Sequence, residues 1–233
     1  MTWAIQPQDV VGLEVTGSEQ RFPVNRIFCV GRNYAEHAQE MGHSGREDPF
    51  FFAKPAGAVW AMGTDSAPVW PYPVQSQDVH HEVELVVALG SGGKNLSLEQ
   101  AEQSIWGYAI GLDMTQRDVQ TQLKKQGRPW EVGKAFDASA PMGPLHPRAA
   151  LGVLTKGAIS LDINGERRQS GDINQMIWPI VETIAYLSTR FTLQAGDLIM
   201  TGTPAGVGPV QVGDVLTATV EGLGSVQLTV GRS

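Results

Sequence analysis

The chain has 233 residues, of which 17 are Lys or Arg, 24 are Asp or Glu, 42% are hydrophobic and one is Cys. Its length and apolar fraction are sufficient for one domain with a sizeable core. The net charge of -7 argues against a nucleic-acid partner, because neutralising phosphates requires clustered Lys and Arg. The lone Cys29 excludes a disulfide framework and a thiolate metal cage, and it fits a reducing cytoplasm.

The N-terminal segment shows no basic stretch followed by an apolar stretch, which a secretion signal requires. We interpret residues 1–25 as an N-terminal extension or a small hairpin, and residues 26–233 as a single domain. The longest apolar stretches, such as Leu85 to Leu89, are far shorter than the roughly 20 residues of a membrane-spanning helix. We therefore expect a soluble, cytoplasmic protein with no membrane partner.

The 27 Gly and 14 Pro divide the chain into short segments, which favours strands. Val83 to Leu89 is a β-branched apolar run that ends at a glycine-rich loop, and it predicts a strand. Leu98 to Trp106 follows Ser97, a residue typical of a helix N-cap, and predicts a helix. The first half of the chain thus alternates strands with a covering helix.

The second half of the chain is predicted to be mostly β. Residues from Ala158 to Ser170 alternate in polarity around Asn164-Gly165, which is the strongest two-residue hairpin signal. A helix is expected over Trp178 to Arg190, where apolar residues recur at helical spacing and Pro179 can occupy the first turn. Further strands are predicted at Leu198 to Met200, Val215 to Val220 and Val226 to Val230.

Three carboxylates lie at places where strands would bring them together. Side chains at i and i+2 of a strand share a face, so Glu82 and Glu84 would lie side by side. Asp113 follows another apolar stretch, at the expected end of a second strand. Three carboxylates would form an all-oxygen site that suits Mg²⁺, Mn²⁺ or Ca²⁺. The same alternation also fits the solvent face of a half-buried strand without a metal.

Two pairs of residues raise alternative chemistry. His80 and His81 could suggest zinc, but neighbouring residues on a strand point to opposite faces, so at most one could join the carboxylates. His37 and Glu40 have the i, i+3 spacing that brings an imidazole and a carboxylate to one face of a helical turn. Such a pair can act as an oriented general base that activates water. A solvated helix face is the simpler interpretation of the same spacing.

The glycine-rich loop Gly202 to Gly208 lacks the Lys and Ser/Thr of a phosphate-binding loop. We interpret it as a loop that binds a substrate carboxylate or as a plain turn. No serine has the Gly-x-Ser-x-Gly spacing of a nucleophile elbow. Cys29 lies in an apolar run and is most simply a core residue.

A series of short motifs runs in order from about Arg26 to the C-terminus. These motifs are Phe28–His37, Phe52–Pro55, His80–Glu84, Gly111–Thr115, Arg117–Asp118, Gly127–Trp130, Lys134 and Thr201–Pro204. In sequence and spacing they resemble the fumarylacetoacetate hydrolase family. Within that family the chain is similar to the compact acylpyruvate and fumarylpyruvate hydrolase branch.

The resemblance implies an α+β, predominantly β fold, in which a mixed β-sheet roll carries peripheral helices. Residues 26–233 would form a single catalytic domain, and the protein would be a homodimer. Glu82, Glu84 and Asp113 match the family's metal ligands, and the implied ion is Mg²⁺ or Mn²⁺. A solvent-exposed strand then becomes the less favoured interpretation of these carboxylates.

The resemblance also implies roles for individual side chains. His37 and Glu40 match a catalytic pair that the family carries on a short lid helix. Lys134 matches a lysine beside the oxo group of the substrate, and Gln120 a residue that positions the attacking water or the substrate. Further matching positions, with substrate binding as the expected role, are Arg32, Lys54, Arg117 and Thr203. The last arginine could instead orient a metal-ligating carboxylate.

The implied reaction is hydrolysis of the C3–C4 bond of a 2,4-dioxo acid, such as fumarylpyruvate or another acylpyruvate, to pyruvate and a carboxylic acid. The acid would bind the ion through its C1 carboxylate and C2 oxygen. His37 and Glu40 would deprotonate the water that attacks C4, and Lys134 with the ion would stabilise the leaving pyruvate enolate.

Several alternatives share that enolate. They are oxaloacetate decarboxylation, oxaloacetate tautomerisation, and isomerisation or decarboxylation in aromatic catabolism, and fold and metal site do not choose among them. A catalytically silent metal-binding dimer is the alternative from a different class. His43 and Arg46 contact the distal group of the substrate or face solvent, and the sequence favours neither.

Overall fold

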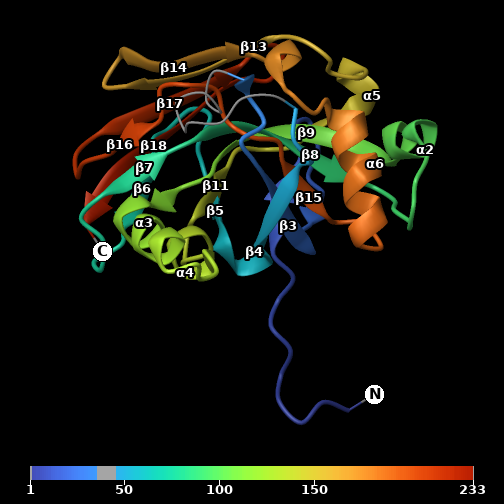
Figure 1. Ribbon diagram of the computed structural model, residues 1–233, viewed down its shortest axis with the longest axis horizontal. Helices are drawn as coiled ribbons and strands as arrows, with labels where there is room; N and C mark the ends of the chain where they lie inside the picture. The colour runs from blue at the N-terminus through green and yellow to red at the C-terminus, as the bar shows by residue number, and fades with distance from the viewer. Residues whose placement is uncertain (1, 36–45, 233) are drawn as a thin grey trace.

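The computed structural model describes residues 2–35 and 46–232. Strands form most of its regular structure, and they build two large sheets that lie one above the other (Figure 1). Helices lie at the edges of this assembly, with α2 and α6 at one side and α3 and α4 at the other. The predicted α+β, predominantly β fold with a mixed sheet and peripheral helices is confirmed.

The larger sheet has eight strands in the order β4-β3-β15-β8-β9-β11-β5, with β12 paired to β9. It is mixed, because β3 runs parallel to β15 and β11 parallel to β5, whereas the other pairs are antiparallel. Its strands are β3 (Arg26–Gly31), β4 (Phe50–Pro55), β5 (Val59–Ala61), β8 (Val83–Leu89), β9 (Ile105–Leu112), β11 (Ala140–Met142), β12 (His146–Pro147) and β15 (Leu198–Met200).

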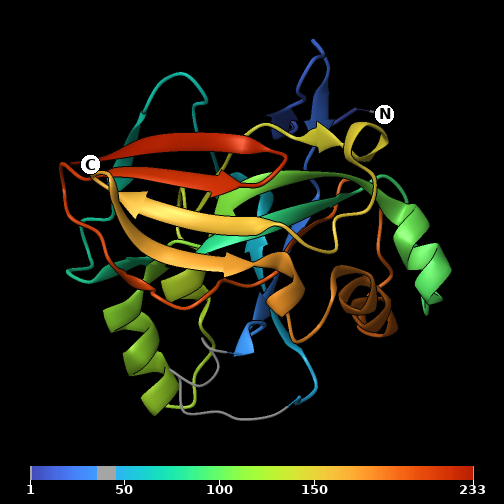
Figure 2. The same ribbon diagram turned by 90° about the horizontal axis from the view of Figure 1, so that it is seen from above.

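The second sheet has five strands in the order β14-β13-β17-β18-β6 and covers one face of the first (Figure 2). Its strands are β6 (Val69–Tyr72), β13 (Ala158–Ile163), β14 (Glu166–Asp172), β17 (Val215–Val220) and β18 (Gly224–Arg232). A three-stranded sheet joins β7 (Val79–His81), β10 (Thr115–Gln116) and β16 (Gly208–Pro209).

Strand β8 is buried on both faces, and its alternation places the candidate carboxylates. Leu85 and Val87 pack in the core between the two sheets, whereas Val86 and Ala88 pack in a second core with Cys29. A strand buried on both faces reads as a continuous apolar run, as this one does. By the same alternation Glu84 shares the face of Val86, away from the five-stranded sheet.

The turns and caps follow local rules. The β13–β14 hairpin turns at Asn164 and Gly165, whose φ angles of 53° and 81° are those of the predicted two-residue turn. Ser97 caps α2 in a capping box with Gln100, as its position predicts. The helical elements are η1 (Ala56–Ala58), α2 (Leu98–Ser104), α3 (Arg117–Lys125), α4 (Glu131–Lys134), α5 (Arg148–Leu151), η2 (Ile173–Gln175) and α6 (Ile180–Arg190).

Two predicted helix boundaries are wrong. The first helix ends at Ser104 and does not reach Trp106, because Ile105 already pairs with Leu89 in the large sheet. Pairing with a buried strand overrides the helical periodicity of this short segment. Pro179 precedes α6 as its N-cap and is not in its first turn.

The N-terminal region forms the small hairpin that the sequence analysis offered as one interpretation. Strands β1 (Gly12–Glu14) and β2 (Arg21–Pro23) pair antiparallel. Leu13 and Phe22 pack in the second core, so the hairpin is attached to the large sheet. Among the described residues, no helix has both the length and the apolar character needed to cross a membrane.

Candidate active site

Three carboxylates meet at the ends of β8 and β9. Glu82 precedes β8, Glu84 is its second residue, and Asp113 directly follows β9, where its N–H donates to the carbonyl of Glu82 at 2.8 Å. Each of the three offers an oxygen that lies within 4.8 Å of the others, and all three side chains are buried. The structure therefore brings the three predicted metal ligands together. Glu82 and Glu84 lie on the same side, as the alternation of side chains along a strand requires.

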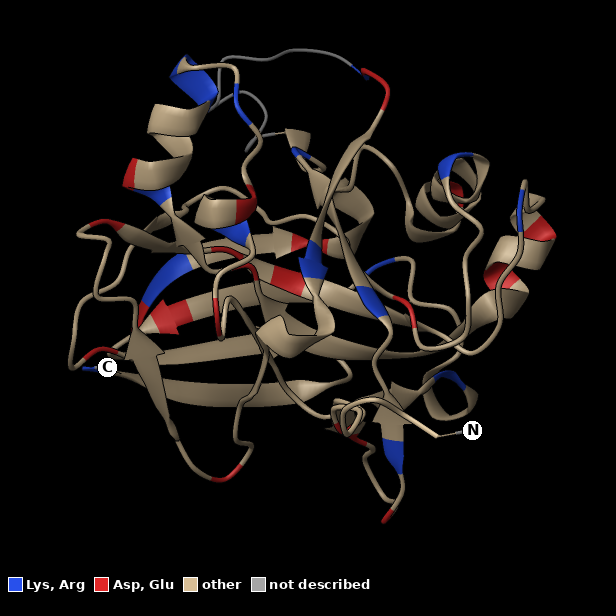
Figure 3. Cartoon of the chain, turned by 90° about the horizontal axis from the view of Figure 1, so that it is seen from below, with Lys and Arg blue, Asp and Glu red and all other residues tan. Residues whose placement is uncertain are grey.

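Two cations pair with this cluster from the pocket side. Lys134 Nζ lies 2.9 Å from Glu82 Oε2 and 2.7 Å from Asp113 Oδ2. Arg117 donates to the other carboxylate oxygen of Glu82 and also, at 2.7 Å, to Gln120 Oε1. Burial alone lowers the pKa of Lys134, but Asp113 and Glu82 outweigh it, so the net pKa is raised and the ammonium stays charged. Figure 3 shows both acidic and basic positions on the central strands and on the surrounding helices.

Glu84 differs from its two neighbours because no cation touches it among the described residues. Its side chain is buried, and its Oε2 accepts one hydrogen bond of 2.8 Å from the N–H of Gly202. Burial and the nearby charges of Asp113 and Glu82 raise the pKa of Glu84 well above its ordinary value. A divalent cation bound by the three carboxylates would supply the missing positive charge, so the donor set fits Mg²⁺ or Mn²⁺.

The loop after β15 reaches Glu84 only because of a glycine. Gly202 has a φ of 97°, and a Cβ at this position would lie 2.7 Å from the Cβ of Asn33. A larger residue would therefore move the N–H that Glu84 accepts from. The glycine-rich loop thus serves the carboxylate cluster itself, which neither of the two interpretations from sequence included.

Lys54 is placed differently from its predicted role in gripping substrate. Its ammonium lies 2.9 Å from Asp113 Oδ1, on the side of this carboxylate away from Lys134. It also donates to backbone carbonyls at Ser139 (3.0 Å), Met114 (3.4 Å) and Lys134. These partners occupy the three protons of the ammonium, so in this structure Lys54 orients Asp113 and does not line the pocket.

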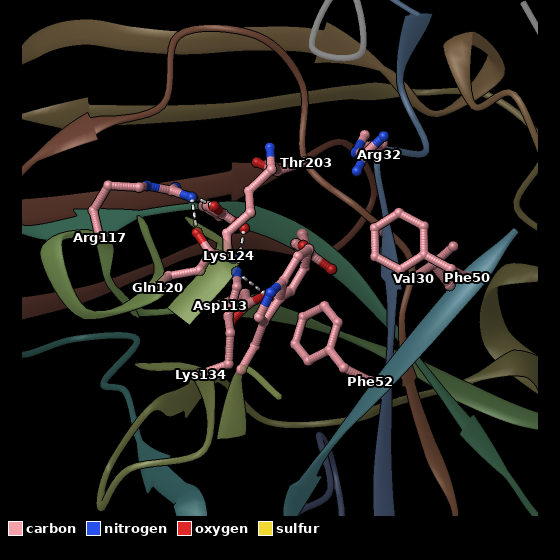
Figure 4. Close-up of a pocket in the computed structure, with 14 residues that line it drawn as sticks. Val30, Arg32, Phe50, Phe52, Asp113, Arg117, Gln120, Lys124, Lys134 and Thr203 are labelled. Atoms are coloured by element: carbon pink, nitrogen blue, oxygen red, sulfur yellow. Dashed lines mark hydrogen bonds and ion pairs between the residues drawn. The ribbon is translucent and has the colours of Figure 1, made fainter. Parts of the chain in front are cut away.

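The carboxylate cluster forms part of the lining of a pocket, whose lining residues Figure 4 draws as sticks. Helix α3 contributes Arg117, Gln120 and Lys124, which its periodicity places on one face at i, i+3 and i+7. These residues and Lys134 lie at one side of the pocket in Figure 4, and Arg32 and Phe50 lie at the other. Other lining residues include Phe52, Trp130 and Thr203.

The pocket combines polar groups with aromatic walls. The Arg32 guanidinium lies over the ring of Phe50 at 5.0 Å, and the Phe50 and Trp130 rings meet edge to face at 5.8 Å. Among the described residues, no carboxylate forms an ion pair with Arg32 or Lys124. Arg32 and Lys124, which lie at different sides of the pocket, are therefore available to bind an anion.

The two histidines point away from the metal-ligand cluster. His81 Nδ1 lies 2.8 Å from the amide oxygen of Gln169, and burial lowers the pKa of His81 to about 4. His80 lies 2.9 Å from Asp78, and burial with the nearby Arg117 lowers its pKa. Among the described residues, neither histidine belongs to the group of possible metal ligands.

Two predicted catalytic residues, His37 and Glu40, lie outside the described residues, as does His43. Arg46 is described and does not line the pocket. It pairs with Glu182 on α6 and lies 4.2 Å over the ring of Trp178, so it anchors its segment to that helix. Its side chain is 51% exposed, so of the two roles considered from sequence the structure favours facing solvent.

Lys124 and Phe50 line the pocket and Gln169 contacts Thr203, but none of the three was predicted as a site residue from the sequence. The signal for Lys124 was present, because its spacing from Arg117 and Gln120 is helical. For Phe50 only its neighbour Phe52 was in a recognised motif. Gln169 gave no local signal, because its partners come from the segments around His81 and Thr203.

Comparisons with known proteins agree with this geometry. The fumarylacetoacetate (FAA) hydrolase C-terminal family model matches residues 26–231. The oxaloacetate tautomerase YcgM of Escherichia coli is 46% identical over 202 residues, which are 86% of this chain and 90% of that protein. A fumarylpyruvate hydrolase of Ralstonia sp is 42% identical over 185 residues, covering 79% of this chain and 94% of that one.

A solved structure matches over the full length of both chains. It is the crystal structure of fumarylpyruvate hydrolase from Pseudomonas aeruginosa in complex with Mn²⁺ and pyruvate, with 50% identity, 100% coverage of each chain and a TM-score of 0.97. The resemblance stated from the motifs is thereby confirmed. With the family model matching nearly the whole chain, the protein belongs to the fumarylacetoacetate hydrolase family.

Proposed function

We propose that this protein is a divalent-metal-dependent hydrolase that cleaves the C3–C4 bond of a 2,4-dioxo acid, with fumarylpyruvate as the first candidate. The observation that carries the proposal is the buried cluster of Glu82, Glu84 and Asp113 in the wall of a pocket that also presents the Lys134 ammonium. The full-length similarity to a fumarylpyruvate hydrolase solved with Mn²⁺ and pyruvate supports it.

The three carboxylates would hold Mg²⁺ or Mn²⁺, which when bound supplies a Lewis acid for the C1 carboxylate and C2 oxygen of the acid. Lys134 lies beside Glu82 and Asp113, so its ammonium is placed to stabilise negative charge at the C2 oxygen. Arg117 keeps Glu82 in position from the pocket side, and Lys54 keeps Asp113 in position from the other side of that carboxylate. The chain thus provides both the ion site and a second positive charge.

Water is the second reactant. Its oxygen adds to C4, the C3–C4 bond breaks with its electron pair moving toward the C2 carbonyl, and a proton returns to C3. One water is consumed, and pyruvate and a carboxylic acid are released. We keep His37 and Glu40 as the proposed groups that accept the proton from water, and Gln120, which lines the pocket, as the group that positions it.

The other residues that line the pocket fit the rest of fumarylpyruvate. This substrate carries a second carboxylate beyond a flat enoyl chain. Arg32 and Lys124 are cations without a carboxylate partner among the described residues, and Phe50, Phe52 and Trp130 supply flat apolar walls. A dicarboxylate with an extended apolar middle is therefore favoured over a short monoanionic acylpyruvate.

Oxaloacetate tautomerisation is the second candidate, because the YcgM enzyme that catalyses it is 46% identical to this chain. That reaction moves a proton between C3 and an oxygen through the same enolate and consumes no water. We also propose that the protein is a homodimer, whichever reaction it catalyses, and light scattering of the purified protein tests this.

The two candidates are separated by parallel assays with Mg²⁺ or Mn²⁺. Fumarylpyruvate, acetylpyruvate and oxaloacetate are each offered, while loss of the substrate chromophore and release of pyruvate are followed. We expect stoichiometric pyruvate from fumarylpyruvate, loss of activity in Glu84→Gln, and full activity in Glu99→Gln, an exposed carboxylate on α2. Activity confined to keto–enol exchange of oxaloacetate would reject hydrolysis in favour of tautomerisation.

A further inference from the structure

Gln169 links the five-stranded sheet to the pocket. It lies on β14, where Glu166, Arg167 and Arg168 are exposed, yet its own exposure is 0%. Its amide nitrogen lies 2.7 Å from Thr203 Oγ1, which lines the pocket, and 2.9 Å from the carbonyl oxygen of Pro204. A fully buried amide thus contacts a pocket residue without lining the pocket itself.

The orientation of this amide is fixed by backbone groups that have only one hydrogen-bonding role. The carbonyl of Pro204 can only accept, so the group that faces it is the NH₂ of Gln169. The N–H of Val83 can only donate, and it lies 3.0 Å from Gln169 Oε1. A flipped amide would place both of these groups against the wrong partner.

The fixed amide determines the direction of the Thr203 hydroxyl. An NH₂ group only donates, so Thr203 Oγ1 must accept from Gln169 and cannot donate back. Among the described residues the hydroxyl of Thr203 has no acceptor for its own proton. Since Thr203 lines the pocket, that proton is available to an oxygen of a bound ligand.

We propose that Gln169 is a positioning residue that holds the hydroxyl of Thr203 as a hydrogen-bond donor to an oxygen of the bound 2-oxo acid. The identity of this ligand rests on the proposed function. A hydroxyl fixed before the ligand arrives needs no reorientation when negative charge develops on that oxygen, and such preorganised donors are the effective ones. Gln169 therefore contributes to the site from a different sheet, through one hydrogen bond.

A purely structural role is the competing explanation. The same amide joins β14 to Val83 and to Pro204, so its loss would leave buried groups unpaired and lower stability in any case. Loss of activity in a single variant therefore cannot separate the two roles. A double-mutant cycle can, because a positioning effect disappears when the Thr203 hydroxyl is already gone.

The experiment compares wild-type protein with Gln169→Met, Thr203→Val and the double variant, all in the full chain loaded with Mn²⁺. Binding of pyruvate is measured by calorimetry, and kcat and KM are measured with fumarylpyruvate. The matched control is Gln227→Met, since Gln227 donates its amide to Thr217 Oγ1 at 3.1 Å in the same sheet, away from the pocket. Melting curves and Mn²⁺ titrations show that each variant is folded and loaded.

We expect Thr203→Val to weaken pyruvate binding about tenfold or more, the effect of losing a hydrogen bond to a charged group. Gln169→Met should weaken it by a smaller factor, and the double variant should bind no more weakly than Thr203→Val alone. Gln227→Met should bind like wild type. Losses that multiply in the double variant would overturn the proposal, and so would wild-type protein that binds no pyruvate.

A measurement on the wild-type protein keeps the proposal testable if Gln169→Met does not fold. A neutron structure of the Mn²⁺ and pyruvate complex should show the Thr203 deuteron directed at pyruvate and a Gln169 deuteron directed at Thr203 Oγ1. A Thr203 deuteron directed elsewhere overturns the proposal. If binding follows the expected cycle but fumarylpyruvate is not cleaved, the hydrolase assignment fails and the positioning role stands.

Discussion

Lys54 and Lys134 contact opposite oxygens of Asp113, and their surroundings differ. Lys54 reaches Oδ1 at 2.9 Å and is otherwise surrounded by backbone carbonyls, including that of Ser139 at 3.0 Å. Lys134 reaches Oδ2 at 2.7 Å, and its other partner is the carboxylate of Glu82, in the wall of the pocket. One lysine is thus fixed by backbone carbonyls, whereas the ion-pair partners of the other are groups that a metal ion would also bind; the Lys134 ammonium also lies 5.1 Å over the ring of Phe52.

The largest effect is expected from removing the fixed lysine. Lys54→Met would leave Asp113 without its rear partner and would remove the ammonium donor from three backbone carbonyls, of which that of Ser139 still accepts from the N–H of Met114. We therefore expect a loss of about 3–5 kcal/mol in the free energy of unfolding. Added Mn²⁺ should restore little of it, because the ion cannot reach the carbonyl of Ser139. Urea denaturation with and without Mn²⁺ measures both quantities. Stability close to that of wild type would contradict the structural role of Lys54.

Lys134→Met should instead reduce turnover while leaving the metal site intact. The loss of one fixed positive charge beside a developing oxyanion lowers kcat by about 10²–10³-fold. Mn²⁺ should bind at least as tightly as in wild type, since a competing ammonium is removed from Glu82 and Asp113. Steady-state kinetics and Mn²⁺ titration check these opposite signs, with the exposed Lys156→Met as the control. A variant that lost Mn²⁺ binding would show that Lys134 builds the site.

Glu84 extends the comparison, because among the described residues neither Lys54 nor Lys134 forms an ion pair with it. Its pKa is raised in the folded protein, so above its ordinary value of 4.5 the unfolded chain binds fewer protons than the folded one. The free energy of unfolding of metal-free protein should therefore fall as pH rises from about 4.5, by at most about 1.4 kcal/mol per pH unit.

Melting of the metal-free protein at increasing pH measures this slope, and Glu84→Gln should reduce it. With Mn²⁺ present the slope should reverse, because the ion requires the ionised carboxylate. A metal-free wild type that gains stability over the same range would mean that Glu84 is ionised and paired.

The smallest effect is expected from removing the pocket cations Arg32 and Lys124. Arg32 is half-buried and Lys124 is exposed, so water screens their attraction for a distal carboxylate. Arg32→Met should raise KM for fumarylpyruvate several-fold, and Lys124→Met should raise it less. KM for acetylpyruvate, which lacks that carboxylate, should stay unchanged in both variants. An equal rise for both substrates would assign these cations to the common 2-oxo acid end.

The sequence was sufficient where one local rule decided the outcome. Alternation along a strand placed Glu82 and Glu84 together, and the end of the next apolar run placed Asp113 beside them. The Asn164-Gly165 signal likewise predicted its hairpin, because only residues that tolerate positive φ fit that turn. The periodicity of 98–106 misled at its end, because pairing with β8 is decided by residues distant in sequence.

The positions of Lys54 and Gln169 also depend on residues that are distant in sequence. Lys54 was expected at the substrate, and only the fold shows that carbonyls from two later segments surround it. Gln169 sits in a polar strand that looks exposed, and its burial follows from the packing of Val83 and Thr203 against it. Spacing predicts which side chains share a face, whereas saturation of their hydrogen bonds requires the tertiary structure.

We propose that Glu82, Glu84 and Asp113 hold a divalent ion, and that this ion displaces the Lys134 ammonium from its contacts with Glu82 and Asp113. Anomalous diffraction at the manganese edge, from crystals soaked in Mn²⁺, tests it most directly. The account predicts one strong peak in contact with all three carboxylates, with the Lys134 ammonium moved from its contacts with Glu82 and Asp113 toward the pocket. A peak that any one of the three carboxylates does not touch, or Lys134 still bridging the same two oxygens, would contradict it.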